Sequence, residues 1–294
     1  MAPREMREQL YRALAEAASP DGMGEFDTPL EWRELLVIYL PKKSESMRIA
    51  KKRDITLTSQ VQKLLCAAVE KAYERPSYNR ILPTNAGWVA GDGAQDAAAP
   101  VGACINQAHT LKHDLFIVFA DQRRFFPSMD RDVILLASAW AGVPKDVRDL
   151  ADKLYREAVV RIDTAHGLTD AVPGVSSLKS GSPQGCRFST LKARILMASL
   201  AEAVNILSEG VSLWNGSDGC VCEQAEFGDD VTLPCSSLPA AVRLTEILGA
   251  WAWAVNSALG IDGYSKLCIA GVTFDEKGRA RDVAESGGLV GHSV

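Results

Sequence analysis

The chain has 294 residues, of which 47% are hydrophobic and 23% are charged, an ordinary composition for a globular protein. Its formal net charge of −5 argues against nucleic-acid binding over the whole surface, because phosphate contacts draw on Lys and Arg, so any such binding must be local. No apolar run approaches the roughly 20 residues of a membrane-spanning helix, and the N-terminus lacks a secretion signal. We therefore expect an intracellular, non-secreted protein without a membrane segment, whose seven cysteines are reduced thiols.

The first third of the chain predicts a helix, a strand, a basic loop and a second helix. Residues 1–30 open with an amphipathic pattern and are expected to form a short helical segment, and residues 33–40 predict a strand. Residues 84–100, rich in Gly, Ala and Asp, predict a connecting loop. The basic loop holds Lys42, Lys43, Arg48, Lys51, Lys52 and Arg53, and the second helix has its apolar face at Leu57, Val61, Leu64, Leu65, Ala68 and Val69.

The rest of the chain alternates strands and helices. Residues 115–120 form a continuous apolar run typical of a buried central strand, which ends on Asp121. Residues 219–234 predict two strands joined by a tight turn at Gly228-Asp229-Asp230. Helices are expected at 131–141, 145–160, 188–208 and 237–258, and a further strand near 267–274.

Two acidic motifs are candidates for metal-dependent chemistry. The first, DQRRFFPSMD at 121–130, places Asp121 at the end of a buried strand, which would hold its carboxylate rigidly. The second, EFGDD at 226–230, places two adjacent carboxylates in a hairpin turn, where their repulsion costs stability unless a cation compensates. Magnesium suits such oxygen ligands. Taken singly, each motif has an ordinary alternative, because an Asp after a strand often caps a turn and Gly-Asp is common in hairpins.

A third motif, SGSPQGCRFS at 180–189, is a glycine-rich loop that leads into a helix. Gly181 and Gly185 would let the backbone approach a ligand closely, and the Gln184 amide could hydrogen-bond a base or a sugar. The ordinary alternative is a Gly/Pro turn before a helix, but this string is rarer than the two acidic ones.

In this order, the three motifs resemble motifs A, B and C of reverse transcriptases. The DxxxFFPS form of motif A resembles retron-like enzymes, while LLVIYLPKK with KKRDITLTSQVQKLL resembles the finger motifs of non-LTR retrotransposon enzymes. Gly87-Trp88 matches a Gly-Phe pair of that family, and ALGIDGYSK resembles motif D. The resemblance runs from about residue 33 to residue 270 and implies an α+β right-hand polymerase palm, an antiparallel sheet backed by helices, with fingers but no evident thumb.

The resemblance also implies a division of the chain and a set of substrates. It gives an N-terminal helical segment (1–30), fingers (31–110), a palm with motifs A to D (111–275) and the start of a truncated C-terminal region (276–294). The implied function is RNA-directed DNA polymerisation of retrotransposon origin. The implied partners are an RNA template, a DNA primer and deoxynucleoside triphosphates.

Residue roles follow from the resemblance and from two-metal chemistry. Asp121 and Asp229 would bridge two Mg²⁺ ions, with Mn²⁺ as the alternative, and Asp230 would be the third, less direct carboxylate. Phe126 would be the steric gate that clashes with a 2′-hydroxyl. The other implied nucleotide-binding residues are Lys43 and Arg53 (charge of the triphosphate), Gln122 and Arg123 (backbone cradle for it), Gln184 and Gly185 (pocket for the new base pair) and Lys266 (general acid for pyrophosphate).

Three alternatives compete with this interpretation. An RNA-dependent RNA polymerase would share Gly-Asp-Asp, but Phe126 and the SPQG string favour the reverse transcriptase. A catalytically inactive, transposon-derived relic would bind nucleic acid or a partner without turnover, and the lack of an evident thumb favours it. A structural helical protein with chance motifs is the third alternative, against which the order of the motifs argues.

Overall fold

A computed structural model describes Glu8, Arg12 and residues 34–41, 52–77, 85–88, 91–123, 125–156, 158–170, 181–208, 210–212, 221–259 and 267–282. Of the expected N-terminal helical segment, only Glu8 and Arg12 fall within these ranges, and both are helical. Lys43 and Lys266 lie outside the described residues, as does most of the segment after residue 276.

An antiparallel central sheet organises the second half of the chain. Its strand order is β12-β11-β3-β9-β8, and the short β10 pairs with the end of β3. The continuous apolar sequence of β3 explains its central position, since both of its faces are covered for much of its length. The strands are β3 (Leu115–Arg123), β8 (Ala225–Phe227), β9 (Asp230–Cys235), β10 (Ala258–Leu259), β11 (Cys268–Phe274) and β12 (Ala280–Asp282).

The two faces of β3 pack against different helices. Phe116, Val118 and Ala120 belong to the main core together with α8 (Arg187–Leu207) and α9 (Leu238–Ala254). Leu115 and Ile117 point to the other face, because side chains alternate along a strand, and pack with Cys104 and Ala108 of α4 (Ala94–Leu111). Toward its end this second face opens, since Phe119 is 37% exposed. Asp121 therefore lies on the open part of the sheet.

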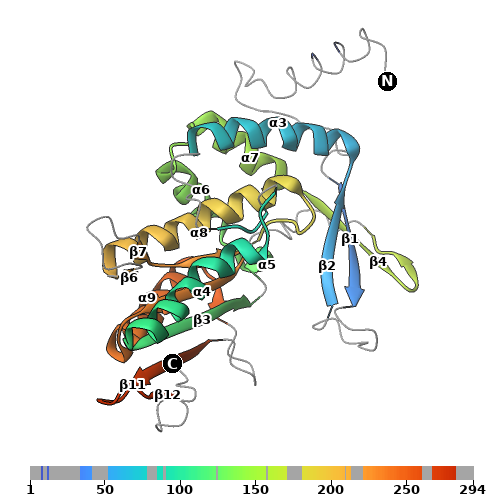
Figure 1. Cartoon of the computed structure of the whole chain (residues 1–294). Helices are drawn as coiled ribbons and strands as arrows, with labels where there is room; N and C mark the ends of the chain where they lie inside the picture. The colour runs from blue at the N-terminus through green and yellow to red at the C-terminus, as the bar shows by residue number, and fades with distance from the viewer. Residues whose placement is uncertain are drawn as a thin grey trace.

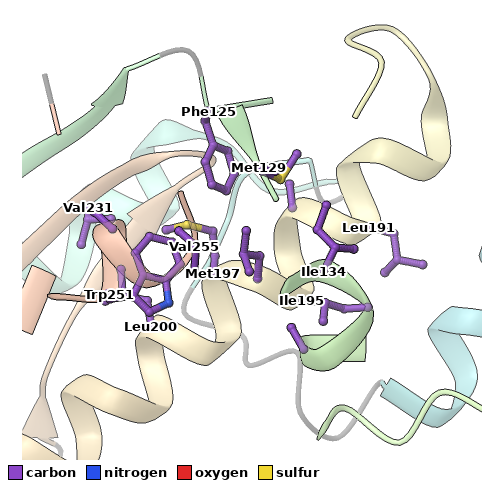
Figure 2. Packing of buried hydrophobic residues seen from close by; sticks show 14 of the residues in the cluster. Phe125, Met129, Ile134, Leu191, Ile195, Met197, Leu200, Val231, Trp251 and Val255 are labelled. Carbon is purple, nitrogen blue, oxygen red and sulfur yellow. The ribbon is translucent and has the colours of Figure 1, made fainter. Parts of the chain in front are cut away.

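The main core joins the central sheet to a layer of helices. Figure 2 shows Trp251 and Leu200 lying near Val231, with Met197 toward Phe125. The Trp251 indole nitrogen donates to the Ser199 hydroxyl at 3.0 Å, so the polar edge of the ring is satisfied inside the core. The remaining helices are α3 (Gln60–Ser77), α5 (Phe125–Ser128), α6 (Arg131–Trp140), which Asp130 caps, and α7 (Lys145–Arg156).

A second sheet, the outer sheet, has the strand order β2-β1-β4-β5 and stands beside the helices on the right of the view in Figure 1. Its β1–β2 and β4–β5 pairs are antiparallel, and its β1–β4 pair is parallel. Its strands are β1 (Glu34–Pro41), β2 (Lys52–Thr58), β4 (Val159–Thr164) and β5 (Gly167–Leu168). A separate two-stranded sheet is formed by β6 (Val211–Ser212) and β7 (Val221–Cys222).

The predicted fold class, an α+β protein with an antiparallel sheet backed by helices, is confirmed. The predicted strands at 33–40, 115–120 and 267–274 and the hairpin around Gly228 are present as β1, β3, β11 and β8–β9. Several local predictions were wrong. The expected loop at 84–100 contains the start of α4, and Leu57 belongs to the end of β2 rather than to the helix that follows. Lys52 and Arg53 of the expected basic loop begin β2, and the expected helix at 145–160 ends at Arg156, because Val159 begins β4. Among the described helices, none is long and apolar enough to cross a membrane.

Candidate active site

The antiparallel register of the central sheet brings the two acidic motifs together. Asp121, near the end of β3, is the cross-strand partner of Asp230, the first residue of β9. Asp230 is in turn the partner of Phe227 on β8. Residues directly opposite in an antiparallel pair project to the same face, so Asp121, Asp230 and Phe227 form one row on the open face of the sheet.

The turn between β8 and β9 presents Asp229 at the end of this row. Only Gly228 and Asp229 separate the paired residues Phe227 and Asp230. Gly228 has φ +70°, the conformation that a two-residue hairpin requires at its first central position in a II′-type turn. Asp229 is half-buried, whereas Asp230 is exposed. Partial burial nevertheless raises the pKa of Asp230, because desolvation penalises its charged form.

Whether these carboxylates fit Mg²⁺ depends on what else supplies ligands. Among the residues that the structure describes, no group of three or more His, Cys, Asp or Glu side chains is arranged to hold a metal ion. Magnesium in polymerase-type sites is, however, commonly held by one or two carboxylates together with water and substrate phosphates. The row of Asp121 and Asp230 beside Asp229 fits a site in which one or two carboxylates hold the ion and water and substrate phosphates supply the other ligands. The assignment of the three aspartates as metal ligands stays a prediction.

Phe126 lies immediately beyond β3, in the short helix α5. Its ring is half-buried and meets the Trp88 ring edge to face, with the centroids 5.3 Å apart at 70°. It also contacts the Phe125 ring at 5.9 Å, and Phe125 itself is buried in the main core. Phe126 is thus held between the core and an exposed indole, five residues after Asp121.

The glycine-rich loop at 181–185 is fixed to the same segment. The Gly181 amide donates to the Met129 carbonyl at 2.5 Å, and the Ser182 amide donates to the Phe126 carbonyl at 2.8 Å. The Ser182 hydroxyl donates to the buried Ser189 hydroxyl at 2.7 Å, which closes the loop onto the first turn of α8. The loop that resembles motif B is therefore tied directly to the residue that resembles the steric gate.

The outer sheet reaches the other side of this loop. The Thr56 amide of β2 donates to the Gln184 carbonyl at 2.6 Å. Gly185 has φ +109°, and a Cβ there would lie 2.8 Å from the Thr56 carbonyl oxygen, so strand and loop approach closely because residue 185 is glycine. Arg53 is exposed on the same strand, three positions before Thr56, or about 10 Å along it.

Gln122 does not offer its side chain to the open face. It is 3% exposed, its amide nitrogen contacts the Met197 sulfur at 3.2 Å, and its amide oxygen accepts from the Ser257 hydroxyl at 2.9 Å. Only its backbone remains for the expected triphosphate cradle, together with that of Arg123, which pairs with Ala258. The two sequence-predicted lysines, Lys43 and Lys266, lie outside the described residues.

One group of residues at the site was missed by the sequence reasoning. The segment 85–88, with the sequence Asn-Ala-Gly-Trp, lies along β8 and touches the Gly228 turn. Asn85 is only 4% exposed, and Glu226 beside it is 1% exposed. The only sequence signal was the match of Gly87-Trp88 to a family pair, and the segment otherwise looked like a connecting loop.

Comparison with known proteins supports the fold. No protein-family model matches the sequence, and no curated protein matches it. Among matching solved structures, telomerase from Candida albicans in complex with a TWJ fragment of telomeric RNA has a TM-score of 0.56 at 10% identity, covering 92% of this chain and 46% of that one. Apo telomerase from Candida tropicalis, truncated from its C-terminal domain, has a TM-score of 0.55 at 9% identity, covering 87% and 56%.

These matches show a reverse-transcriptase-like fold, because telomerase is a reverse transcriptase and the central sheet backed by helices corresponds to a polymerase palm. The chain spans about half the length of the telomerase chains that it matches, between 42% and 56%. At identities of 9% to 10% the likeness concerns the fold alone.

Proposed function

We propose that the chain is the fingers and palm of a reverse-transcriptase-like nucleotidyltransferase, which extends a DNA primer by copying an RNA template. The observation that carries the proposal is the pairing of Asp121 with Asp230 beside Asp229, on a part of the central sheet that α4 leaves open. The reverse-transcriptase-like fold supports the same assignment.

Asp121 and Asp229 would hold two Mg²⁺ ions, or Mn²⁺, with Asp230 as the third, less direct carboxylate. Bound metal would supply activation of the primer 3′-hydroxyl and charge stabilisation of the leaving pyrophosphate. The chain's own part is to fix the carboxylates. β3 is central in the sheet and paired on both sides, and the turn that carries Asp229 is closed by only two residues.

The nucleotide would bind over Phe126 and the glycine-rich loop. Phe126 would exclude a 2′-hydroxyl by steric conflict, and Gln184 and Gly185 would face the new base pair. Arg53, exposed on β2 next to that loop, supplies positive charge for the triphosphate, and Lys43 and Lys266 would add to it. This arrangement is supported by the contacts of the loop with both Phe126 and Thr56.

The finer identity of the enzyme rests on the motifs. The DxxxFFPS string that begins at Asp121 favours an origin in a retron-like element, and the finger motifs favour a non-LTR retrotransposon. An RNA template agrees with the likeness to telomerase, which was solved in complex with a fragment of telomeric RNA. An inactive relic is the second candidate, and the observation that favours it is the absence of a three-group metal cluster among the described residues.

Primer extension tests the proposal most directly. With Mg²⁺ and, separately, Mn²⁺, on matched RNA and DNA templates, the chain should add deoxynucleotides to a DNA primer. Asp121→Asn and Asp229→Asn should each abolish extension, since each removes a charge from the row. Asp163→Asn alters an exposed strand carboxylate of the outer sheet and should leave extension unchanged.

The outcomes separate the candidates. No extension by the parent chain with either metal, together with retained binding to an RNA–DNA duplex, would favour the relic. Equal use of ribonucleotides and deoxynucleotides would favour an RNA polymerase and would remove the role assigned to Phe126.

A further inference from the structure

Asn85 binds the aspartate turn through both ends of its side-chain amide. Its amide nitrogen donates to the Gly228 carbonyl at 3.0 Å, and its amide oxygen accepts from the Gly228 amide at 3.1 Å. The same oxygen accepts from the Gly87 amide at 2.9 Å. A side chain that satisfies both backbone groups of one residue fixes the orientation of the two peptide planes on either side of that residue. Here that residue directly precedes Asp229.

The backbone of the segment 85–88 lies against the same turn. The Ala86 amide donates to the Glu226 carbonyl at 3.0 Å, and Asn85 forms a parallel bridge with Glu226. A Cβ built on Gly87 would lie 2.1 Å from the Gly228 nitrogen and 2.6 Å from its Cα, so the two backbones touch where no side chain fits. We call residues 85–88 the clasp.

Trp88 extends the clasp from the turn to Phe126. A Cβ built on Gly228 would meet the Trp88 ring at 3.2 Å, so the indole covers the turn. Its other contact is the edge-to-face pair with Phe126 at 5.3 Å. Trp88 has φ +62°, a left-handed conformation that a bulky residue adopts only where its surroundings impose it. Trp88 remains 38% exposed.

We propose that the clasp couples the turn that carries Asp229 to the steric gate, Phe126. Asn85 is a positioning residue for Asp229, and Trp88 determines sugar specificity by packing against the Phe126 ring. This inference rests on the proposed function, because it assigns roles within that reaction. A rigid gate rejects a 2′-hydroxyl only if the ring cannot swing away, and the Trp88 ring occupies one side of Phe126.

Sugar discrimination tests the role of Trp88. Trp88→Ala should reduce the preference for deoxynucleotides over ribonucleotides about tenfold, because the Phe126 ring loses the indole that packs against one side of it. Trp88→Phe should restore most of the preference, because an aromatic ring is kept at the contact. Trp253→Ala, which removes a tryptophan that is 86% exposed on α9, should not change it. An unchanged preference in a folded Trp88→Ala chain would overturn the role of Trp88.

The role of Asn85 predicts a split between kcat and KM. Asn85→Ala should lower kcat by roughly 10- to 100-fold, since a misplacement of about 1 Å can cost that much, with little change in the KM for nucleotide. Asn85→Asp keeps the acceptor for the Gly228 and Gly87 amides but loses the donor, so its kcat should be intermediate. Asn106→Ala, on the exposed side of α4, is the matched control. A rise in KM alone would overturn the positioning role.

A second readout does not depend on activity. Hydrogen–deuterium exchange of the peptide that spans the turn should be faster in Asn85→Ala than in the parent chain, and close to the parent in Asn85→Asp, because the Gly228 amide keeps its acceptor only in the second variant. Unchanged exchange in Asn85→Ala would refute the clasp itself. If the parent chain adds no nucleotide while the exchange result holds, the proposed function fails and the clasp stands as a structural feature.

Discussion

Glu226 is a carboxylic acid enclosed beneath the clasp, two residues before the aspartate turn's glycine. It is 1% exposed, its neighbour across the hairpin is Val231, and its Oε1 atom has no hydrogen-bond partner among the described residues. Burial raises the pKa of Glu226 from 4.5 to about 8, and a hydrogen bond with Asn85 offsets this in part. At neutral pH the group is therefore mostly protonated in the folded chain.

This burial makes stability depend on pH in a defined direction. Between pH 4.5 and about 8 the folded chain binds a proton at Glu226 that the unfolded chain has lost, so this contribution to stability is complete below pH 4.5 and is lost as pH rises through 8. Glu226→Gln removes the titration. We expect the variant to gain free energy of unfolding relative to the parent between pH 6 and pH 9, by at most about 1.4 kcal/mol per pH unit.

Urea unfolding at pH 6, 7.5 and 9 measures this difference. Glu246→Gln, which changes an exposed carboxylate on α9, is the matched control. A difference between Glu226→Gln and the parent that stays constant with pH would contradict a raised pKa at Glu226.

At the scale of elements, the loop at 181–185 depends on glycine where it meets Phe126. Gly181 has φ +89°, and a Cβ there would lie 2.7 Å from the Pro127 carbonyl oxygen and 2.9 Å from that of Phe126. Both contacts are with backbone, so they cannot be relieved by a rotamer change. The loop at 181–185 and the backbone of Phe126 and Pro127 therefore lie closer together than any residue other than glycine at position 181 would allow.

Gly181→Ala should consequently destabilise the chain by about 1–3 kcal/mol, from strain in the left-handed region together with the clash. Gly249→Ala is the matched substitution, because Gly249 lies inside α9 with open space around its Cα. That variant should be more stable than the parent by about 0.5–1 kcal/mol, as for glycine in a helix interior. Thermal unfolding of both variants compares them, and equal midpoints would contradict the account of the loop.

The elements that the sequence predicted are those with strong periodicity. The apolar run of β3 and the stripe of α8 required no tertiary information. In contrast, α4 buries only Cys104 and Ala108 among its residues, so no apolar stripe marks it, and the Gly, Ala and Asp content before and at its start is typical of a loop. The strand β2 was partly assigned to the following helix, because Leu57 happens to continue that helix's spacing while it is 43% exposed on the outer sheet.

For the candidate site, motif order predicted which residues would be near one another, and the register of β3 and β9 shows how the two acidic motifs meet. The clasp could not be predicted in the same way. Asn85 and Gly228 are 143 residues apart in sequence, and their contact is made by one side chain with backbone atoms. Such a contact produces no periodic pattern in the sequence. It also requires no particular residue type as the partner, because every residue has backbone atoms, so the contact is seen only in the folded chain.

At the scale of the whole molecule, one hydrophobic core connects α3 with the central sheet. The core includes Leu65 and Tyr73 of α3 as well as Val118 of β3 and Val231 of β9. A polar junction reinforces the helix layer, since the Tyr155 hydroxyl contacts the Cys186 sulfur at 2.9 Å and the Cys66 sulfur at 3.6 Å. Helices that would belong to the fingers and a sheet that would belong to the palm therefore share the same buried interior.

A shared interior predicts a single unfolding transition. Leu65→Ala, on a side chain that is 2% exposed, should lower the free energy of unfolding by about 2–5 kcal/mol. It should do so equally when unfolding is followed by tryptophan fluorescence, to which Trp251 of the main core contributes as one of six tryptophans, and by far-ultraviolet circular dichroism. Leu64→Ala, on the adjacent residue of the same helix, removes a side chain that is 48% exposed and should cost about 0.5 kcal/mol or less. If fluorescence and circular dichroism instead gave different transitions for Leu65→Ala, with the fluorescence transition unchanged, α3 would unfold as a unit of its own. Nucleotide binding between fingers and palm would then have to order these two parts.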